Sequence, residues 1–284
     1  MSAAPTDRAR RRHVHRSMAR RRRRRAAGLA LVVLVTAGLG GVLSGGGRGD
    51  GLLLPGGEEF ERLTVGRGAR GATVVRWGEP EGRQPAVIFF HGWRQEEPSD
   101  YRGWIEHLAR QGNTVIVPRY QTARTPPAQV FPNALAGICA ALDAVPIQVG
   151  SLVVAGHSAG GALAVDYAAT ANRDPRLPRP RAVFAVYPGR AIRRYPGGIP
   201  TVDPSAISSD TTVVAMAGAD DQVVGEGLAI ELIEELGNVP SARRRLVRVA
   251  NPAVDDHRAP ERATAPSRAA FWAPLDRLIT AVRR

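Results

Sequence analysis

The chain has 284 residues, of which 44% are hydrophobic and 23% charged, values typical of a globular protein and not of a low-complexity chain. Its one cysteine, Cys139, excludes an internal disulfide, a zinc site built from several cysteines and an iron–sulfur cluster. Of the formal net charge of +13, residues 1–25 carry +10, because they hold eleven arginines and one aspartate. The rest of the chain carries only +3, so we expect no nucleic-acid-binding domain.

Two further exclusions concern cofactors. All 39 basic residues are arginine, and the absence of lysine excludes Schiff-base catalysis and phosphate binding by a P-loop. The sequence also has no HExxH motif, no GxGxxG motif with an acidic partner and no Walker motif. We therefore expect neither a metal nor a nucleotide cofactor.

The amino-terminal part of the chain indicates a membrane or export segment. After the arginine-rich tail at 1–25, residues 26–44 contain no charge, and as a helix they would span about 28 Å, close to the ~30 Å of a hydrocarbon core. The positive-inside rule keeps the tail in the cytoplasm and places the rest of the chain outside it. Two interpretations stay open, a single-pass signal anchor in the cell membrane or a cleaved secretory signal. We favour the anchor because the apolar run is longer than the apolar core of most signal sequences, and we expect a flexible linker at 45–59.

Residues 60–284 alternate short apolar runs with helical patterns and are predicted to form one domain. The predicted strands are 62–65, 72–77, 86–90, 114–117, 151–155, 182–186, 212–217 and 245–249. The predicted helices are 101–110, 128–144, 159–171, 227–236 and 267–282. Continuous apolar strands that alternate with helices indicate the α/β class, with a doubly wound, mostly parallel sheet of eight strands.

Ligands bind beyond the carboxyl ends of the strands in such a sheet, so the residues after each strand are the candidate site. The strand 151–155 is followed by Gly156-His157-Ser158-Ala159-Gly160 and then by a helical pattern. This is a GxSxG motif in the strand–turn–helix context that it requires. A sharp turn would force Ser158 into a strained conformation, and side chains at positions 156 and 160 would collide with the neighbouring strand and helix.

A serine nucleophile needs a base that a third group holds in place. Asp220 and Asp221 follow the strand 212–217, and His257 follows the strand 245–249. Four other histidines are poor candidates for the base: His13 and His15 lie in the tail, His91 precedes the nucleophile in the chain, and His107 falls inside a helix where we expect it at the surface. His157 belongs to the turn itself and cannot easily reach the hydroxyl of Ser158, so His257 remains.

These motifs together resemble the α/β-hydrolase family, of the serine esterase or lipase type without a large cap domain. In that family the chain order is nucleophile, acid and histidine, and the acid commonly lies in a GxxDxxV pattern. The resemblance implies that Ser158 is the nucleophile, His257 the base and Asp221, in preference to Asp220, the acid that orients it. It also implies an oxyanion hole formed by backbone N–H groups of Trp93, in His91-Gly92-Trp93, and of Ala159.

The resemblance implies a hydrolase of carboxylic esters, with a small-molecule or lipid ester as substrate and an acyl-enzyme on Ser158. An acyltransferase, a peptidase and a non-catalytic, membrane-tethered binding module remain alternatives. Residues 188–211 are too few for a cap domain and indicate a short lid or an open loop, which favours bulky or extended esters. Arg190, Arg193 and Arg194 in this loop either attract anionic substrates or form a solvated face, and we favour the second interpretation. The sequence does not indicate an oligomeric state.

Overall fold

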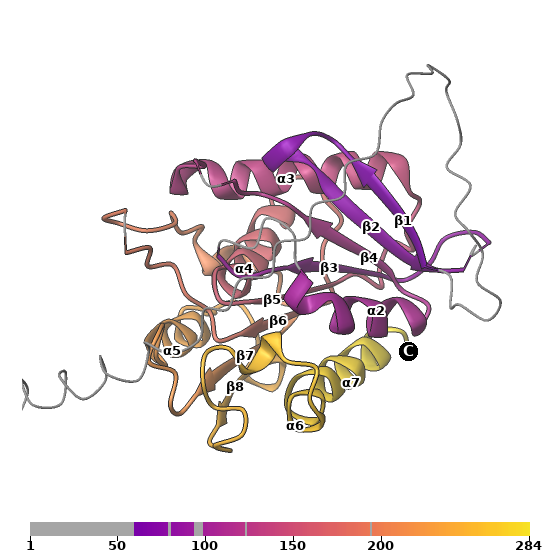
Figure 1. The fold of residues 1–284 in the computed structure, drawn as a ribbon. Coiled ribbons are helices and arrows are strands. Elements are labelled where there is room, and N and C mark those ends of the chain that lie inside the picture. The colour runs from indigo at the N-terminus through magenta and orange to yellow at the C-terminus, as the bar shows by residue number, and fades with distance from the viewer. Residues whose placement is uncertain (1–59, 79–80, 94–98, 123, 194) are drawn as a thin grey trace, which may run out of the picture. The chain divides into compact units, whose positions relative to one another are not determined.

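The computed structural model describes residues 60–78, 81–93, 99–122, 124–193 and 195–284 (Figure 1). The predicted tail, apolar segment and linker at 1–59 lie outside these residues, and so does Arg194. Of the helices that the structure describes, none combines the length and the apolar composition needed to cross a bilayer.

The described residues contain one eight-stranded sheet, as predicted from the sequence. Its strands are β1 (Phe60–Val65), β2 (Ala72–Trp77), β3 (Ala86–Phe90), β4 (Thr114–Pro118), β5 (Val153–His157), β6 (Ala182–Val186), β7 (Thr212–Gly218) and β8 (Arg244–Val249). Neighbouring strands follow the order β1-β2-β4-β3-β5-β6-β7-β8. The largest departure from the predicted boundaries is at β5, which begins and ends two residues later than 151–155.

The sheet is parallel from β4 to β8 and antiparallel only where β1 and β2 complete one edge. Every residue of β3, β4, β5 and β6 is buried. Strands that are buried on both faces read as continuous apolar runs, which explains why the sequence pattern located them.

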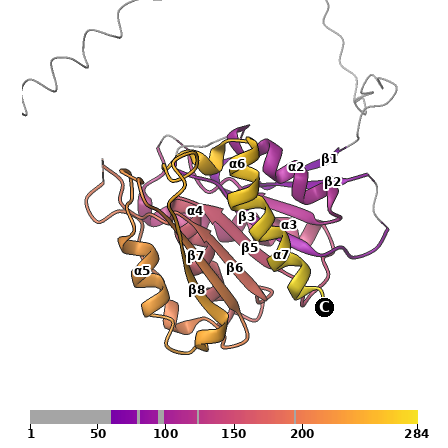
Figure 2. The ribbon, with the colours of Figure 1, turned by 90° about the horizontal axis from the view of Figure 1, so that it is seen from below.

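Helices cover both faces of the sheet. They are α2 (Arg102–Arg110), α3 (Pro127–Ala144), α4 (Ala159–Ala171), α5 (Gly227–Glu234), α6 (Ala265–Ser267) and α7 (Ala273–Val282). Short 3-10 turns occupy Gly68–Arg70, Ser99–Tyr101, Pro204–Ala206, Ser241–Arg243 and Ala259–Glu261. Figures 1 and 2 show α3, α4 and α5 on one face and α2 with α7 on the other, and two large apolar clusters correspond to these two layers.

The last predicted helix, 267–282, is regular only in its second part. A π-helical turn at Arg268–Trp272 joins α6 to α7, and the N–H of Ala273 donates to the carbonyl oxygen of Arg268. Pro274 has no N–H to donate, so the regular hydrogen-bond ladder is interrupted at this point. The π-turn keeps Phe271 and Trp272 buried against the sheet.

Candidate active site

Ser158 lies at the sharp turn between β5 and α4. Its backbone angles, φ 58° and ψ −125°, belong to a region that non-glycine residues rarely adopt. Its N–H donates to the carbonyl oxygen of Val186 in β6 (3.0 Å), and its own carbonyl oxygen accepts from the N–H groups of Gly161 (2.9 Å) and Gly189 (3.1 Å). Contacts to the next strand and to the loop that follows it therefore sustain the strained turn.

The two glycines of the motif are required by close backbone contacts. A Cβ atom at Gly156 would lie 2.3 Å from the carbonyl oxygen of Gly160, and one at Gly160 would lie 2.2 Å from that of Phe90. Neither distance is tolerable for a carbon atom beside a backbone oxygen. The predicted collisions at positions 156 and 160 are thus confirmed.

The structure brings Ser158, His257 and Asp221 into one hydrogen-bonded row. His257 Nε2 lies 3.0 Å from Ser158 Oγ, and His257 Nδ1 lies 2.7 Å from Asp221 Oδ2. The carboxylate can only accept, so Nδ1 carries a proton and, in the neutral ring, Nε2 is free to accept one from the serine hydroxyl. This is the geometry that a serine nucleophile and its base require.

Asp221 is held in place from its other side as well. Its Oδ1 accepts from the backbone N–H groups of Val223 (2.9 Å) and Val224 (3.1 Å) in the turn that follows β7. Burial by itself would raise the pKa of this carboxyl group, but the hydrogen bonds from His257 and the two N–H groups outweigh burial and lower the pKa below its usual value. Asp221 is therefore ionised at neutral pH and attracts a proton on His257.

The neighbouring acid, Asp220, does not reach the histidine. It is exposed, and its Oδ1 accepts from the side chain of Gln222 at 3.0 Å. Asp221 is only 5% exposed and faces His257. Of the two acids that the sequence left adjacent, the one in the GxxDxxV position is the one that meets the imidazole.

The other described histidines have different partners. His91 and His157 are fully buried, and burial lowers the pKa to about 4 for His91 and to about 3 for His157. His107, which was expected at the surface, is half-buried: its ring lies beside Trp272, and its Nε2 atom lies 2.9 Å from Asp276. Across the described parts of the chain, no group of three or more His, Cys, Asp or Glu side chains is arranged to hold a metal ion.

The backbone of the loop after β3 passes close to Ser158. A Cβ atom at Gly92 would lie 3.7 Å from Cβ of Ser158 and 2.9 Å from the hydroxyl of Tyr101. The N–H of Gly92 donates to that hydroxyl (3.1 Å), so this N–H is already engaged within the protein. Trp93 and Ala159, whose N–H groups the sequence predicted for an oxyanion hole, both line the cleft that contains Ser158.

That cleft has a volume of about 1110 Å³ and is open to solvent on one side. Apolar side chains form much of its wall: Trp93, Ala159, Ala191, Ile192, Ile199, Val223 and Val224. The loop between β6 and β7 supplies one side of the cleft and, among its described residues, contains no helix besides the 3-10 turn Pro204–Ala206. Of the short lid and the open loop that the sequence left open, the loop fits the second and forms a wall of the cleft.

Arg190 in this loop is neither a solvated residue nor a free cation. Its guanidinium makes two hydrogen bonds to the carboxylate of Asp166 in α4, at 2.8 and 2.6 Å, and a third to the carbonyl oxygen of Pro200 at 3.1 Å. The Asp166 side chain is fully buried and also accepts from the N–H of Val202 (3.1 Å). The expectation of a solvated arginine face is wrong at this position, because Arg190 joins the loop to the helix that follows Ser158.

Several residues around the site escaped the sequence prediction. Tyr101 places its hydroxyl 2.6 Å from Nδ1 of His157, and Gln121 donates to the carbonyl oxygen of Gly92 at 3.1 Å. The sequence contains one clue to Asp166, which is the only charged residue of its helix. It contains no such clue to Tyr101 or Gln121, because their hydrogen-bond partners lie far away in the sequence.

Comparison with known proteins identifies the fold. A family model described as the alpha/beta hydrolase fold matches residues 87–221, from β3 to Asp221. No curated protein matches the chain.

Solved structures extend the similarity beyond that span. A fungal esterase from Rhizomucor miehei is 16% identical with a TM-score of 0.56, covering 80% of this chain and 84% of its own. Esterase 2 of Thermogutta terrifontis, phosphoramylated by tabun, is 15% identical with a TM-score of 0.60, covering 78% and 94%. An alpha/beta hydrolase from a Medee basin deep-sea metagenome library is 17% identical with a TM-score of 0.55, covering 79% and 98%. At these identities the likeness is one of fold.

The family match covers the nucleophile turn, and the solved structures share the arrangement of the strands and helices around it. Together with the strand order and the strained serine after β5, these findings show that the chain has the α/β-hydrolase fold.

Proposed function

We propose that the chain is a serine hydrolase that cleaves carboxylic esters through an acyl-enzyme on Ser158. The observation that carries the proposal is the unbroken row from Ser158 Oγ to His257 and Asp221, with distances of 3.0 and 2.7 Å. A binding module has no need of such a row, in which each member is oriented by the next.

The reaction begins when His257 Nε2 accepts the hydroxyl proton of Ser158 and the serine oxygen forms a bond to the ester carbonyl carbon. The carbonyl oxygen of the tetrahedral intermediate becomes an anion, which the N–H groups of Trp93 and Ala159 stabilise. The intermediate expels the alkoxide, and His257 returns the proton to it. Water then attacks the acyl-enzyme, again with His257 as base, and releases the acid and free Ser158.

Electrostatics favour this sequence of steps. The lowered pKa of Asp221 keeps its carboxylate charged, and a charged carboxylate stabilises the imidazolium that forms during acylation. Ala159 begins α4, so its N–H belongs to the end of the helix that carries a partial positive charge. Each oxyanion donor in such a site is worth about 3–4 kcal/mol of barrier.

The relatives and the cleft support the chemical class of the substrate. The solved relatives from Rhizomucor miehei and Thermogutta terrifontis are esterases, and the second was captured phosphoramylated by tabun. By analogy we expect fluorophosphonate reagents to modify Ser158. The open cleft, whose wall is partly apolar, favours bulky or extended esters, including lipid esters, over small buried substrates.

The test compares Ser158→Ala with the matched variant Ser241→Ala, which changes an exposed serine in the 3-10 turn before β8. Ser158→Ala should abolish both the hydrolysis of p-nitrophenyl esters and fluorophosphonate labelling, whereas Ser241→Ala should retain both. The esters should be graded in chain length and assayed beside a lactone and a peptide amide, so that the acyl preference is read in the same series. Persistent labelling of Ser158→Ala would reject this nucleophile, and a wild-type chain that neither turns over nor labels would favour a binding module.

A further inference from the structure

The peptide bond between Gly92 and Trp93 carries two polar groups that point in opposite directions. In a trans peptide the carbonyl oxygen of one residue and the N–H of the next lie on opposite sides of the bond, and the described residues include no cis peptide. Any contact that fixes the Gly92 carbonyl oxygen therefore also fixes the direction of the Trp93 N–H.

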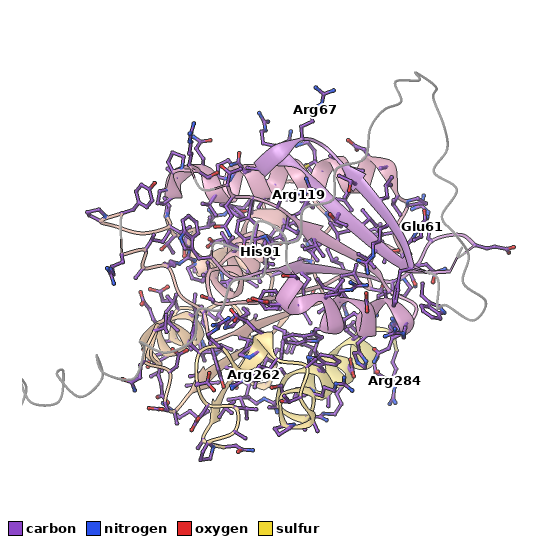
Figure 3. All side chains as sticks on the ribbon, in the orientation of Figure 1. Glu61, Arg67, His91, Arg119, Arg262 and Arg284 are labelled. Carbon is purple, nitrogen blue, oxygen red and sulfur yellow. The ribbon has the colours of Figure 1, made fainter. Side chains whose placement is uncertain are left out.

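Two buried side chains hold that oxygen. Gln121 Nε2 donates to it at 3.1 Å, and His91 Nδ1 donates to it at 2.9 Å. Gln121 is 3% exposed and His91 is fully buried, near the centre of the domain in Figure 3. Burial lowers the pKa of His91 to about 4, so at neutral pH its ring is uncharged and the carbonyl oxygen determines which nitrogen carries the proton.

The preceding peptide is fixed as well. The N–H of Gly92 donates to the hydroxyl of Tyr101 at 3.1 Å, and the hydroxyl of Tyr120 donates to the carbonyl oxygen of His91. Both tyrosines are fully buried. Four side chains thus hold the backbone on both sides of Gly92 in a dry environment, where a hydrogen bond restrains its partners strongly.

The strand order shows where the Trp93 N–H points. In the sheet, β3 lies between β4 and β5. Gln121 follows β4, whereas Ser158 follows β5, so the two lie on opposite sides of the loop after β3. An oxygen held on the Gln121 side turns the N–H of the same peptide to the side of Ser158, and Trp93 and Ser158 line one cleft.

We propose that Gln121 is a positioning residue that aims the Trp93 N–H at the oxyanion, acting with His91 through the Gly92 carbonyl oxygen. The inference rests on the proposed function, because only a tetrahedral oxyanion gives this N–H its catalytic partner. A donor fixed before the reaction costs no reorganisation when the charge develops, so loss of its support weakens binding of the transition state more than binding of the ester.

The test is Gln121→Met, which keeps the length of the side chain and removes the donor. We expect kcat for a p-nitrophenyl ester to fall ~10- to 100-fold with KM changed less than about twofold, because the interaction is made only in the transition state. Affinity for a trifluoromethyl ketone, which forms a tetrahedral adduct with the serine, should fall by the same factor. Loss of a side chain with only a structural role would not lower kcat and the ketone affinity by the same factor.

Gln111→Met is the matched control. Gln111 is half-buried at the end of α2, its amide nitrogen lies 2.9 Å from His107 Nε2, and it precedes β4, so it lies at the strand ends opposite the cleft. This variant should retain kcat and the ketone affinity. If Gln121→Met does not fold, Gln121→Leu removes the donor with a smaller apolar side chain, and the same paired loss is expected.

The outcomes separate the two proposals. An active wild type whose Gln121 variants keep both kcat and ketone affinity would overturn this inference and leave the serine hydrolase intact. An equal loss in Gln111→Met would also overturn it, since the effect would then be general. A wild type without turnover or fluorophosphonate labelling would overturn the proposed function and, with it, the role of Gln121.

Discussion

Ser158 and Asp221 owe their orientation to contacts outside the row that they form with His257. The strained turn fixes Ser158, and the N–H groups of Val223 and Val224 fix the carboxylate of Asp221. The ring of His157 lies 4.8 Å from that of His257 and stays uncharged at neutral pH, because burial and then the nearby charge of His257 lower its pKa to about 3. The ring of His157 therefore does not oppose the imidazolium that the proposed mechanism forms on His257.

Replacement of Asp220 and of Asp221 by asparagine tests which of the two acids orients His257. Asp221→Asn should lower kcat about 10³- to 10⁴-fold, because the amide neither stabilises the imidazolium nor fixes the reactive tautomer. Asp220→Asn removes an exposed carboxylate that bonds only to Gln222 among described residues, so kcat should stay within about threefold. Steady-state kinetics on one ester are sufficient, and the reverse order of effects would assign the acid to Asp220.

Between elements, the pair of Asp166 and Arg190 connects the helix after the nucleophile to the loop that walls the cleft. The pair is nearly closed to solvent, with side-chain exposures of 0% for Asp166 and 10% for Arg190. The carbonyl oxygen of Arg190 also accepts from the N–H of Ile199 at 2.9 Å, which ties two cleft-lining stretches of the loop together. The position of the wall thus depends on α4.

Arg190→Lys keeps the charge but loses the two-pronged contact, which should cost about 1–3 kcal/mol of folding free energy. We expect KM for long-chain esters to rise several-fold while kcat for p-nitrophenyl acetate changes little, because the wall loosens and the triad does not. Arg176→Lys is the control, since Arg176 makes the same two-pronged contact to Asp174 on the exposed surface. Ester kinetics and thermal unfolding check both variants, and an unchanged chain-length preference in Arg190→Lys would contradict the role of this pair.

At the scale of the whole molecule, the charge distribution of the chain separates an arginine-rich tail from a nearly neutral remainder. We propose that residues 26–44 anchor the chain in the cell membrane with residues 60–284 outside the cytoplasm. The support is the uncharged run of 19 residues beside eleven arginines.

Fractionation of cells that express the full-length chain tests this topology. The enzyme should stay in the membrane pellet after an alkaline wash, and a chain that begins at Gly45 should not. Added protease should reach the domain only from the non-cytoplasmic side. A soluble product that starts near Gly45 would replace the anchor by a cleaved signal.

The sequence by itself determined the features that local chemistry encodes. Buried parallel strands read as unbroken apolar runs, which located the central strands β3 to β7. The GxSxG turn could be recognised because its glycines, its serine and the flanking strand and helix are contiguous. His257 followed from the position of each histidine along the chain.

Tertiary structure decided the points that depend on the direction in which a side chain points. Whether Asp220 or Asp221 meets His257 is a matter of one residue in a turn, where neighbouring side chains point apart, and the partner lies 36 residues away. Gln121 reaches Gly92 across 29 residues and Arg190 reaches Asp166 across 24, without any periodic pattern that marks either pair. Such contacts form only when the sheet brings separate loops to one edge, so the spacing of residues along the chain does not predict them.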